Sequence, residues 1–129
     1  MEIVKENSWM VKWNKKVLLN AHSENETANT RKIKKTELSK KYFLEITYKE
    51  SDPAKEKEWN RSFLFFGDTE NELLRKDSTR NVKITAAELK KLFGKQKKIR
   101  IYTIAIPTDP DIAARVRVRR IHLITLVLQ

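Results

Sequence analysis

Polar and apolar residues alternate most clearly in the last fifteen residues of the chain, RVRVRRIHLITLVLQ (115–129). Arg115, Arg117 and Arg119 occupy every second position with valines between them, which predicts a strand that has one face in water. From Ile121 onward both faces are apolar, as is typical of a strand inside a covered sheet or at an interface with another chain. One strand of this length would exceed the usual range of about 3–10 residues. We therefore expect either a bend at Arg119-Arg120 or an overhang beyond the domain.

Three further runs have the composition of strands. In residues 9–13, Trp9, Val11 and Trp13 fall on one face. Residues 43–48 and 59–66 are rich in aromatic or β-branched side chains, which favour strands.

Polar stretches between these runs predict turns and loops. Residues 14–16, Asn-Lys-Lys, predict a tight turn into a hairpin partner at 17–19, because asparagine tolerates left-handed geometry. Residues 20–31 contain no large apolar side chain, and we expect a mobile loop there. Asp109-Pro110-Asp111 predicts a rigid turn, because proline fixes φ and aspartate caps its own turn.

The segment from Thr85 to Gly94 has residues that favour the start and the end of a short helix. Thr85 and Glu88 form a capping box, and Gly94 stands where a left-handed C-cap is needed. Between them Leu89, Leu92 and Phe93 make an apolar stripe, so we expect about two to three helical turns. The comparable segment 37–41 lacks the box, since Lys34 replaces the threonine, and only a turn or a frayed helix is predicted there.

The same order of patterns occurs twice along the chain. A basic-apolar pair, a Glu-Leu pair and a strand follow one another in residues 32–48 and again in 83–103. We expect a duplicated half-domain with pseudo-repeats of approximately 9–66 and 63–128; the alternative is convergence of strand–turn–strand patterning. The expected fold is a single domain over residues 1–129. It is mainly β, an antiparallel sandwich or barrel-like closure of about seven to nine strands with one or two short helices.

The net charge of +11 is unevenly distributed. Residues 90–120 hold ten basic and two acidic side chains, and residues 30–50 hold seven basic and three acidic ones. Such an asymmetry indicates either a solvated face or a polyanionic partner. The predicted anion or partner contacts lie at the start of the last two strands: Lys97, Lys98, Arg100, Arg115, Arg117, Arg119 and Arg120. Arginines at alternate positions, the arginine row (Arg115, Arg117, Arg119), would suit phosphates, an acidic surface of another subunit, or an acidic row in the same chain.

Catalytic and metal-binding patterns are not evident in the sequence. There are two histidines. No carboxylate lies close to His122 in the sequence in a way that suggests a catalytic dyad. The absence of cysteine excludes disulfides and thiolate chemistry. The two glycines, Gly67 and Gly94, do not make a phosphate-binding loop. We therefore expect no catalytic residue, no metal, no cofactor and no enzymatic activity.

The sequence thus predicts a non-catalytic protein-binding or structural module, one component of a larger protein assembly or a homo-oligomer. Its expected contacts are the arginine-rich face and the C-terminal strand, with Ile124, Leu126 and Leu128 at the interface. The alternative is a nucleic-acid-binding β domain that places the basic region 95–120 on the phosphate backbone. Tyr102 is the one aromatic residue in that region, and we expect it to pack. No apolar run is long enough to cross a bilayer and no secretory signal is present, so we expect a cytoplasmic protein without a membrane partner.

Overall fold

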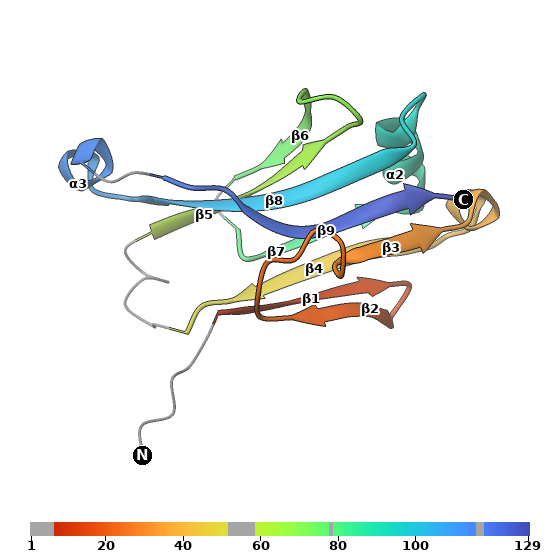
Figure 1. Ribbon diagram of the computed structural model, residues 1–129, viewed down its shortest axis with the longest axis horizontal. Helices are drawn as coiled ribbons and strands as arrows, with labels where there is room; N and C mark the ends of the chain where they lie inside the picture. Colours follow the sequence, from red (N-terminus) through yellow and green to blue (C-terminus); the bar gives the residue numbers. More distant parts are fainter. Residues whose placement is uncertain (1–6, 52–58, 78, 116–117) are drawn as a thin grey trace, which may run out of the picture.

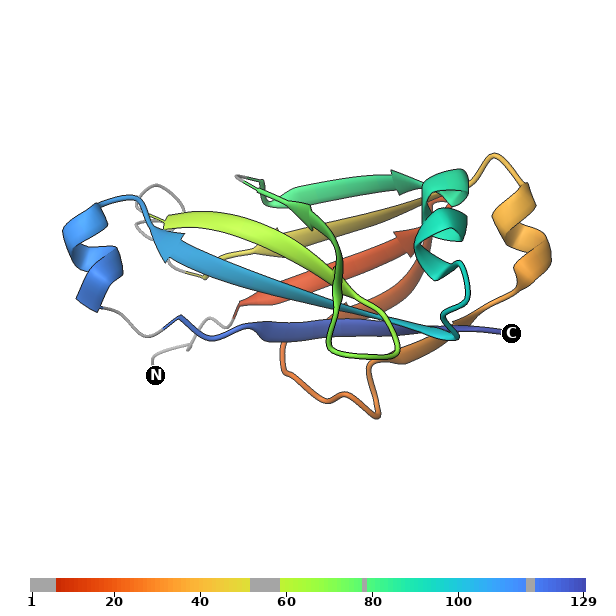
Figure 2. The ribbon, with the colours of Figure 1, turned by 90° about the horizontal axis from the view of Figure 1, so that it is seen from above.

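Two β-sheets pack face to face in the computed structural model, which describes residues 7–51, 59–77, 79–115 and 118–129 (Figures 1 and 2). Sheet A has the strand order β2-β1-β4-β7, and sheet B has the order β3-β9-β8-β5-β6. The strands are β1 (Ser8–Trp13), β2 (Lys16–Ala21), β3 (Thr30–Ile33), β4 (Phe43–Lys49), β5 (Trp59–Phe66), β6 (Glu72–Lys76), β7 (Asn81–Thr85), β8 (Lys98–Pro107) and β9 (Ile121–Leu128). The predicted mainly β sandwich is confirmed, and the sheets do not close into a barrel. One pairing departs from the antiparallel pattern, since β3 runs parallel to β9.

Alternating side chains of both sheets build the core between them. On β1, Trp9, Val11 and Trp13 are buried and the residues between them are partly exposed. Phe63 and Phe65 of β5 face them from sheet B and are fully buried. The face assignment predicted from the period of two is therefore confirmed for β1.

The predicted turn after β1 is also confirmed. Asn14 and Lys15 both have positive φ, 48° and 71°, and connect β1 to β2. Two consecutive residues of positive φ form the type of two-residue turn that matches the twist of a hairpin. The predicted loop 20–31 is shorter than expected, because Thr30 and Arg31 already belong to β3, where they pair with Thr125 and Leu126.

The C-terminal strand is shorter than the sequence predicted. β9 begins at Ile121, whereas Arg115 is the last residue of helix α3 (Pro110–Arg115), and Arg117 lies outside the described residues. The Asp109-Pro110-Asp111 stretch is thus a helix start rather than only a turn: the Asp109 side chain accepts the Asp111 N–H at 2.9 Å. Proline suits the first helical position because its missing N–H would have no partner there.

β9 is also internal to its own sheet. It is hydrogen-bonded on one edge to β3 and on the other to β8, so it does not overhang the domain. A bulge lies opposite Ile101 and Tyr102, where Leu123 is the extra residue, rather than at Arg119-Arg120. The apolar residues on both faces of β9 are covered by this chain, and Ile124 and Leu126 are completely buried. These two predicted interface residues are core residues, and Leu128 is partly buried against the same core.

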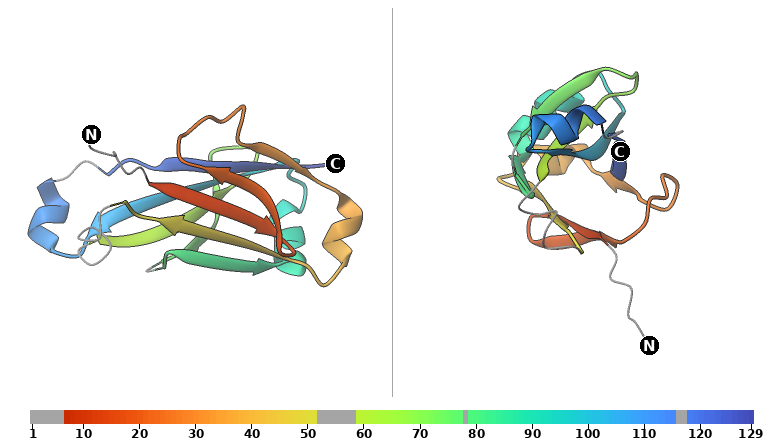
Figure 3. Two further views of the ribbon diagram at one scale, coloured as in Figure 1. Left: turned by 90° about the horizontal axis from the view of Figure 1, so that it is seen from below. Right: turned by 90° about the vertical axis from the view of Figure 1, so that its left-hand side faces the viewer.

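Two helical segments close one end of the sandwich. Helix α2 (Ala86–Phe93) begins at Thr85, whose side chain accepts the Glu88 N–H at 3.2 Å, and ends at Gly94 with φ of 47°. The predicted helix, its cap and its buried stripe are confirmed. The 3-10 helix η1 (Lys35–Ser39) lies where a turn or a frayed helix was predicted. α3 lies at the opposite end of the molecule (Figure 3).

The order of elements recurs along the chain, but the strand pairing does not. β2, β3, η1, β4 and β5 are followed by β6, β7, α2, β8 and β9. Yet β3 pairs with β9 in sheet B, while its counterpart β7 pairs with β4 in sheet A. The two halves therefore do not pair in equivalent ways, and a duplication stays a prediction about the origin of the sequence.

Candidate functional site: a basic groove at the helical end

The fold brings together two lysine-rich segments that are far apart in the sequence. η1 and α2 are in contact and lie side by side at one end of the sandwich (Figure 2). The first segment contributes Lys34, Lys35, Lys40 and Lys41, and the second contributes Lys90, Lys91, Lys95, Lys97 and Lys98. The two segments of excess positive charge thus lie together at one end of the molecule.

A groove of about 740 Å³ lies between these segments and the end of β9. Four lysines line this groove, Lys35, Lys90, Lys95 and Lys97, and we call it the lysine groove. Its apolar lining comes from Leu38, Phe93 and Leu128, and its other lining residues are Thr36, Ser39, Gly94, Gln96 and Gln129. None of these lining residues has an acidic side chain, so the charged side chains of the groove are all basic and lie over a partly apolar floor.

Buried anchors fix the two walls of the lysine groove. Leu89 and Phe93 attach α2 to the core and leave Lys90 exposed. On the other wall Leu38 is buried, and Glu37 accepts a hydrogen bond from Trp13 Nε1 at 2.9 Å. The Glu37 carboxylate is therefore directed at the core strand β1 and does not line the groove.

A second hollow of about 400 Å³ continues the basic surface along sheet B. It is lined by Asp68, Lys97, Lys98 and Arg100, so it shares Lys97 with the lysine groove. Asp68 accepts the backbone N–H groups of Lys97 at 3.0 Å and of Lys98 at 2.8 Å. These bonds, first that of Lys97, lower the pKa of Asp68. The carboxylate thereby holds the turn that presents the two lysines.

Gly67 permits this arrangement by its lack of a side chain. A Cβ at Gly67 would lie 2.5 Å from Gln96 Oε1, closer than atoms approach without displacement. A side chain at residue 67 would therefore displace the Gln96 side chain, whose Oε1 accepts the Asp68 N–H at 2.7 Å.

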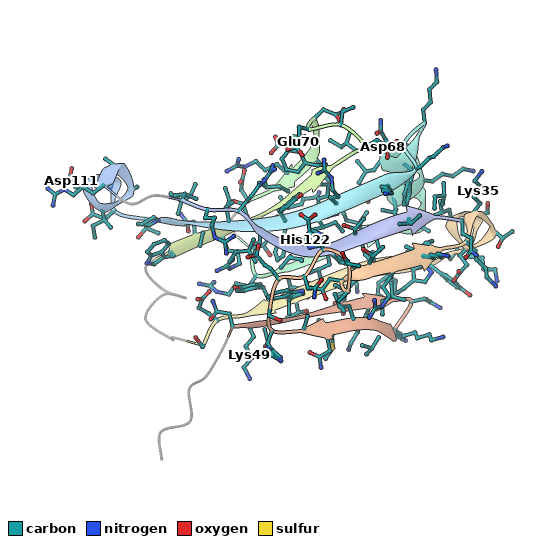
Figure 4. The ribbon with its side chains drawn as sticks, in the orientation of Figure 1. Lys35, Lys49, Asp68, Glu70, Asp111 and His122 are labelled. Carbon is teal, nitrogen blue, oxygen red and sulfur yellow. The ribbon has the colours of Figure 1, made fainter. Side chains whose placement is uncertain are left out.

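The predicted arginine row is not a row in the structure. Arg115 is exposed on α3, at the end of the molecule opposite η1, as the positions of Asp111 and Lys35 show in Figure 4. Arg119 pairs with Glu24 at 2.6 Å, whereas Arg120 pairs with Glu70 at 2.8 Å. The row fails because Arg115 belongs to α3 and residues 118–120 are not part of a strand, so Arg115 and Arg119 do not share one face of a strand. Lys97, Lys98 and Arg100 do lie together, as the sequence predicted.

Three acidic residues that sequence reasoning missed fix this basic surface. Glu24, Asp68 and Glu70 come from loops and meet their basic partners across long sequence separations. No local motif marks them. The sequence contained one indication that η1 and α2 are related. Both segments follow a strand in the same repeated order of patterns.

The structure places His122 in the core. His122 is 2% exposed, and its Nε2 lies 2.8 Å from Thr125 Oγ1. Burial lowers the pKa of His122, so the ring is neutral near pH 7. Glu24 accepts the backbone N–H of His122 at 2.8 Å and does not hydrogen-bond its ring. Within residues 7–51, 59–77, 79–115 and 118–129, no group of three or more His, Asp or Glu side chains is placed to hold a metal ion.

None of the described helices has the length and apolarity needed to cross a membrane. No protein-family model matches the sequence, and no curated protein matches it.

Proposed function

We propose that the protein is a non-catalytic binding module that holds an acidic segment of a partner protein in the lysine groove. The observation that carries this proposal is the lining of the groove, four lysines with no acidic side chain over a partly apolar floor. Lysines surrounding a concave surface attract carboxylates by charge and speed their encounter. Such a module serves as one component of a larger assembly.

The apolar floor favours a peptide over a nucleic acid as the occupant. Leu128, which is only partly buried, offers the main apolar contact to aliphatic side chains that alternate with carboxylates, since Leu38 and Phe93 are 5% and 1% exposed. Single-stranded nucleic acids instead stack their bases on exposed aromatic rings. All eleven aromatic residues lie in the described part of the chain, and none of them is exposed. The packing of Tyr102, which is 5% exposed, is part of this pattern.

The test compares two charge-reversal variants of equal net charge. In K35E/K95E both changes lie in the lysine groove, whereas in K49E/R115E two exposed cations remote from it are changed. Binding of a labelled glutamate-rich peptide that contains leucines is followed by fluorescence anisotropy, and a single-stranded and a double-stranded oligonucleotide of the same charge serve as competitors.

We expect K35E/K95E to weaken peptide binding at least tenfold, with a much smaller loss in K49E/R115E. Equal losses in the two variants would show that net charge alone governs binding and would overturn the assignment of the groove. If an oligonucleotide binds more tightly than the peptide and is lost in K35E/K95E, the groove binds nucleic acid phosphates and the protein-binding proposal is wrong.

A further inference from the structure

Two arginines, one in strand β8 and one just before strand β9, bind the same carboxylate. Arg100 Nη1 lies 2.8 Å from Glu70 Oε1, and Arg120 Nη2 lies 2.8 Å from Glu70 Oε2. Arg100 belongs to β8, Arg120 precedes β9, and Glu70 lies in the loop between β5 and β6, where Figure 4 labels it. Each carboxylate oxygen therefore binds a different guanidinium.

The Arg120 guanidinium is held in place by aromatic rings as well as by Glu70. Its Cζ lies 4.5 Å from the centroid of the Tyr102 ring and 4.9 Å from that of Phe66. These two rings meet edge to face, with centroids 5.4 Å apart, and both are buried. Planar guanidinium groups stack well on such rings, so Arg120 stays oriented when the carboxylate is absent.

Arg100 is likewise held by groups other than the Glu70 carboxylate. Its Nη2 donates to the carbonyl oxygens of Gly67 and Thr69, both at 3.3 Å. The side chain of Arg100 is 23% exposed, whereas that of Glu70 is 61% exposed. The cationic groups are thus the fixed part of the cluster, and the carboxylate is the part that can move into solvent.

The charges of the cluster do not balance. Hydrogen bonds from Arg120 and Arg100 lower the pKa of Glu70, so it carries one negative charge at neutral pH against two guanidinium charges. A phosphate monoester carries about −1.5 to −2 charges at pH 7 and three acceptor oxygens. It would neutralise both arginines more completely than a carboxylate and would bind each of them by charge-assisted hydrogen bonds.

We propose that Arg100 and Arg120 form a binding site for a phosphate monoester, and that Glu70 occupies this site as an intramolecular competitor. The ester belongs either to a phosphorylated side chain of a protein or to a small phosphorylated molecule, since both present the same dianionic group. This site is separate from the lysine groove and does not depend on the function proposed for it.

The test uses two variants that remove the same charge from the same hairpin. E70Q removes the competitor, whereas E72Q changes an exposed carboxylate that has no contact with Arg120 among the ion pairs of the described residues. Phenyl phosphate, a phosphoserine peptide and acetate are titrated into ¹⁵N-labelled protein. The readout is the NMR shift of the Arg100 and Arg120 Nε–H signals, and thermal unfolding checks that each variant is folded.

We expect phenyl phosphate to shift both arginine signals, and E70Q to bind it about two- to fivefold more tightly than wild type, as expected for the loss of an exposed ion pair. E72Q should bind as wild type does. R120K, which keeps the charge but loses the planar group, should weaken binding while remaining folded. A phosphoserine peptide that binds at least tenfold more tightly than phenyl phosphate would assign the ester to a protein, whereas similar affinities would assign it to a small molecule.

Four results would overturn the proposal. The first is that phenyl phosphate binds without shifting the arginine signals, and the second is that it does not bind E70Q. The third is that E70Q and E72Q respond alike, and the fourth is that acetate binds E70Q as tightly as phenyl phosphate does. The last result would identify the arginine pair as a carboxylate clamp without preference for phosphate.

Discussion

The guanidinium carbon of Arg61 lies 3.8 Å from the centroid of the Tyr48 ring, across the interior of the sandwich from β5 to β4. Its Nη2 pairs with Glu50 at 2.6 Å, and its Nη1 donates to Thr103 Oγ1 at 3.1 Å. The side chains of Arg61 and Glu50 are both 7% exposed. The core thus contains a satisfied ion pair, near the end of β4 that is remote from the lysine groove.

Removal of Arg61 should be strongly destabilising. R61M leaves the Glu50 carboxylate buried without its partner, and loss of one member of a buried pair costs about 3–5 kcal/mol. The matched control is R75A, because Arg75 forms an exposed pair with Asp77 whose loss should cost less than about 1 kcal/mol. Urea unfolding gives both values. Similar free energies of unfolding for R61M and R75A would show that the buried pair contributes little.

A second prediction rests on a hydrogen bond between the two sheets. Trp9 Nε1 donates to the carbonyl oxygen of Leu123, the extra residue of the β9 bulge, at 3.0 Å. W9F keeps an aromatic ring on β1 but leaves this buried carbonyl without its donor, at a cost of about 1–3 kcal/mol in addition to lost packing. W59F, at a partly exposed position, is the control in the same urea experiment. An equal loss in both variants would argue against the hydrogen bond.

The elements that the sequence predicted well are those set by neighbouring residues. Trp59–Phe66 forms β5 with the predicted bounds, and α2 begins and ends at the predicted caps because Thr85 and Gly94 act within one turn of the chain. At residues 115–119 two local signals competed. The arginine–valine alternation favoured a strand, but Asp109 and Pro110 start a helix that ends at Arg115.

The candidate site was less predictable because its contacts are not local. Lys97, Lys98 and Arg100 were found from charge density along one segment. The lysine groove also needs Lys35, which comes from η1 on the other side of the groove. Arg119 finds Glu24 and Arg120 finds Glu70 at sequence separations of 95 and 50 residues. Periodicity gives the face of a strand but not the loop that folds over it.

The caps of α2 should contribute measurably to stability, since this helix forms one wall of the lysine groove. T85A removes the acceptor of the Glu88 N–H and should cost about 0.5–2 kcal/mol. G94A forces a Cβ into a backbone with φ of 47° and should cost about 1–2 kcal/mol. K91A, at an exposed position within the helix, should change stability by less than about 0.5 kcal/mol. Thermal unfolding ranks the three, and an unchanged G94A would show that residue 94 does not need its left-handed backbone.

Stability should fall as the solution becomes acidic, in part because of His122. Burial is the main cause that lowers the pKa of His122, opposed by the Glu26 and Glu24 carboxylates and assisted by the charge of Arg100. The ring also packs against Tyr102 at a centroid distance of 5.5 Å. Below its ordinary pKa of about 6.5, the unfolded chain therefore binds a proton at His122 more readily than the folded protein does.

The direction of the effect follows from that difference. The contribution of neutral His122 to the free energy of unfolding is complete above about pH 6.5 and is lost as the pH falls toward its lower folded pKa. H122F keeps a ring beside Tyr102 but cannot bind a proton. Urea midpoints of wild type and H122F, measured between about pH 5 and pH 7.5, isolate the contribution of His122 from that of the carboxylates. Wild type should lose more stability than H122F across this range. Its unfolded state binds a proton at His122 that its folded state does not bind, whereas phenylalanine binds no proton in either state. Parallel pH profiles would show that folding does not lower the pKa of His122.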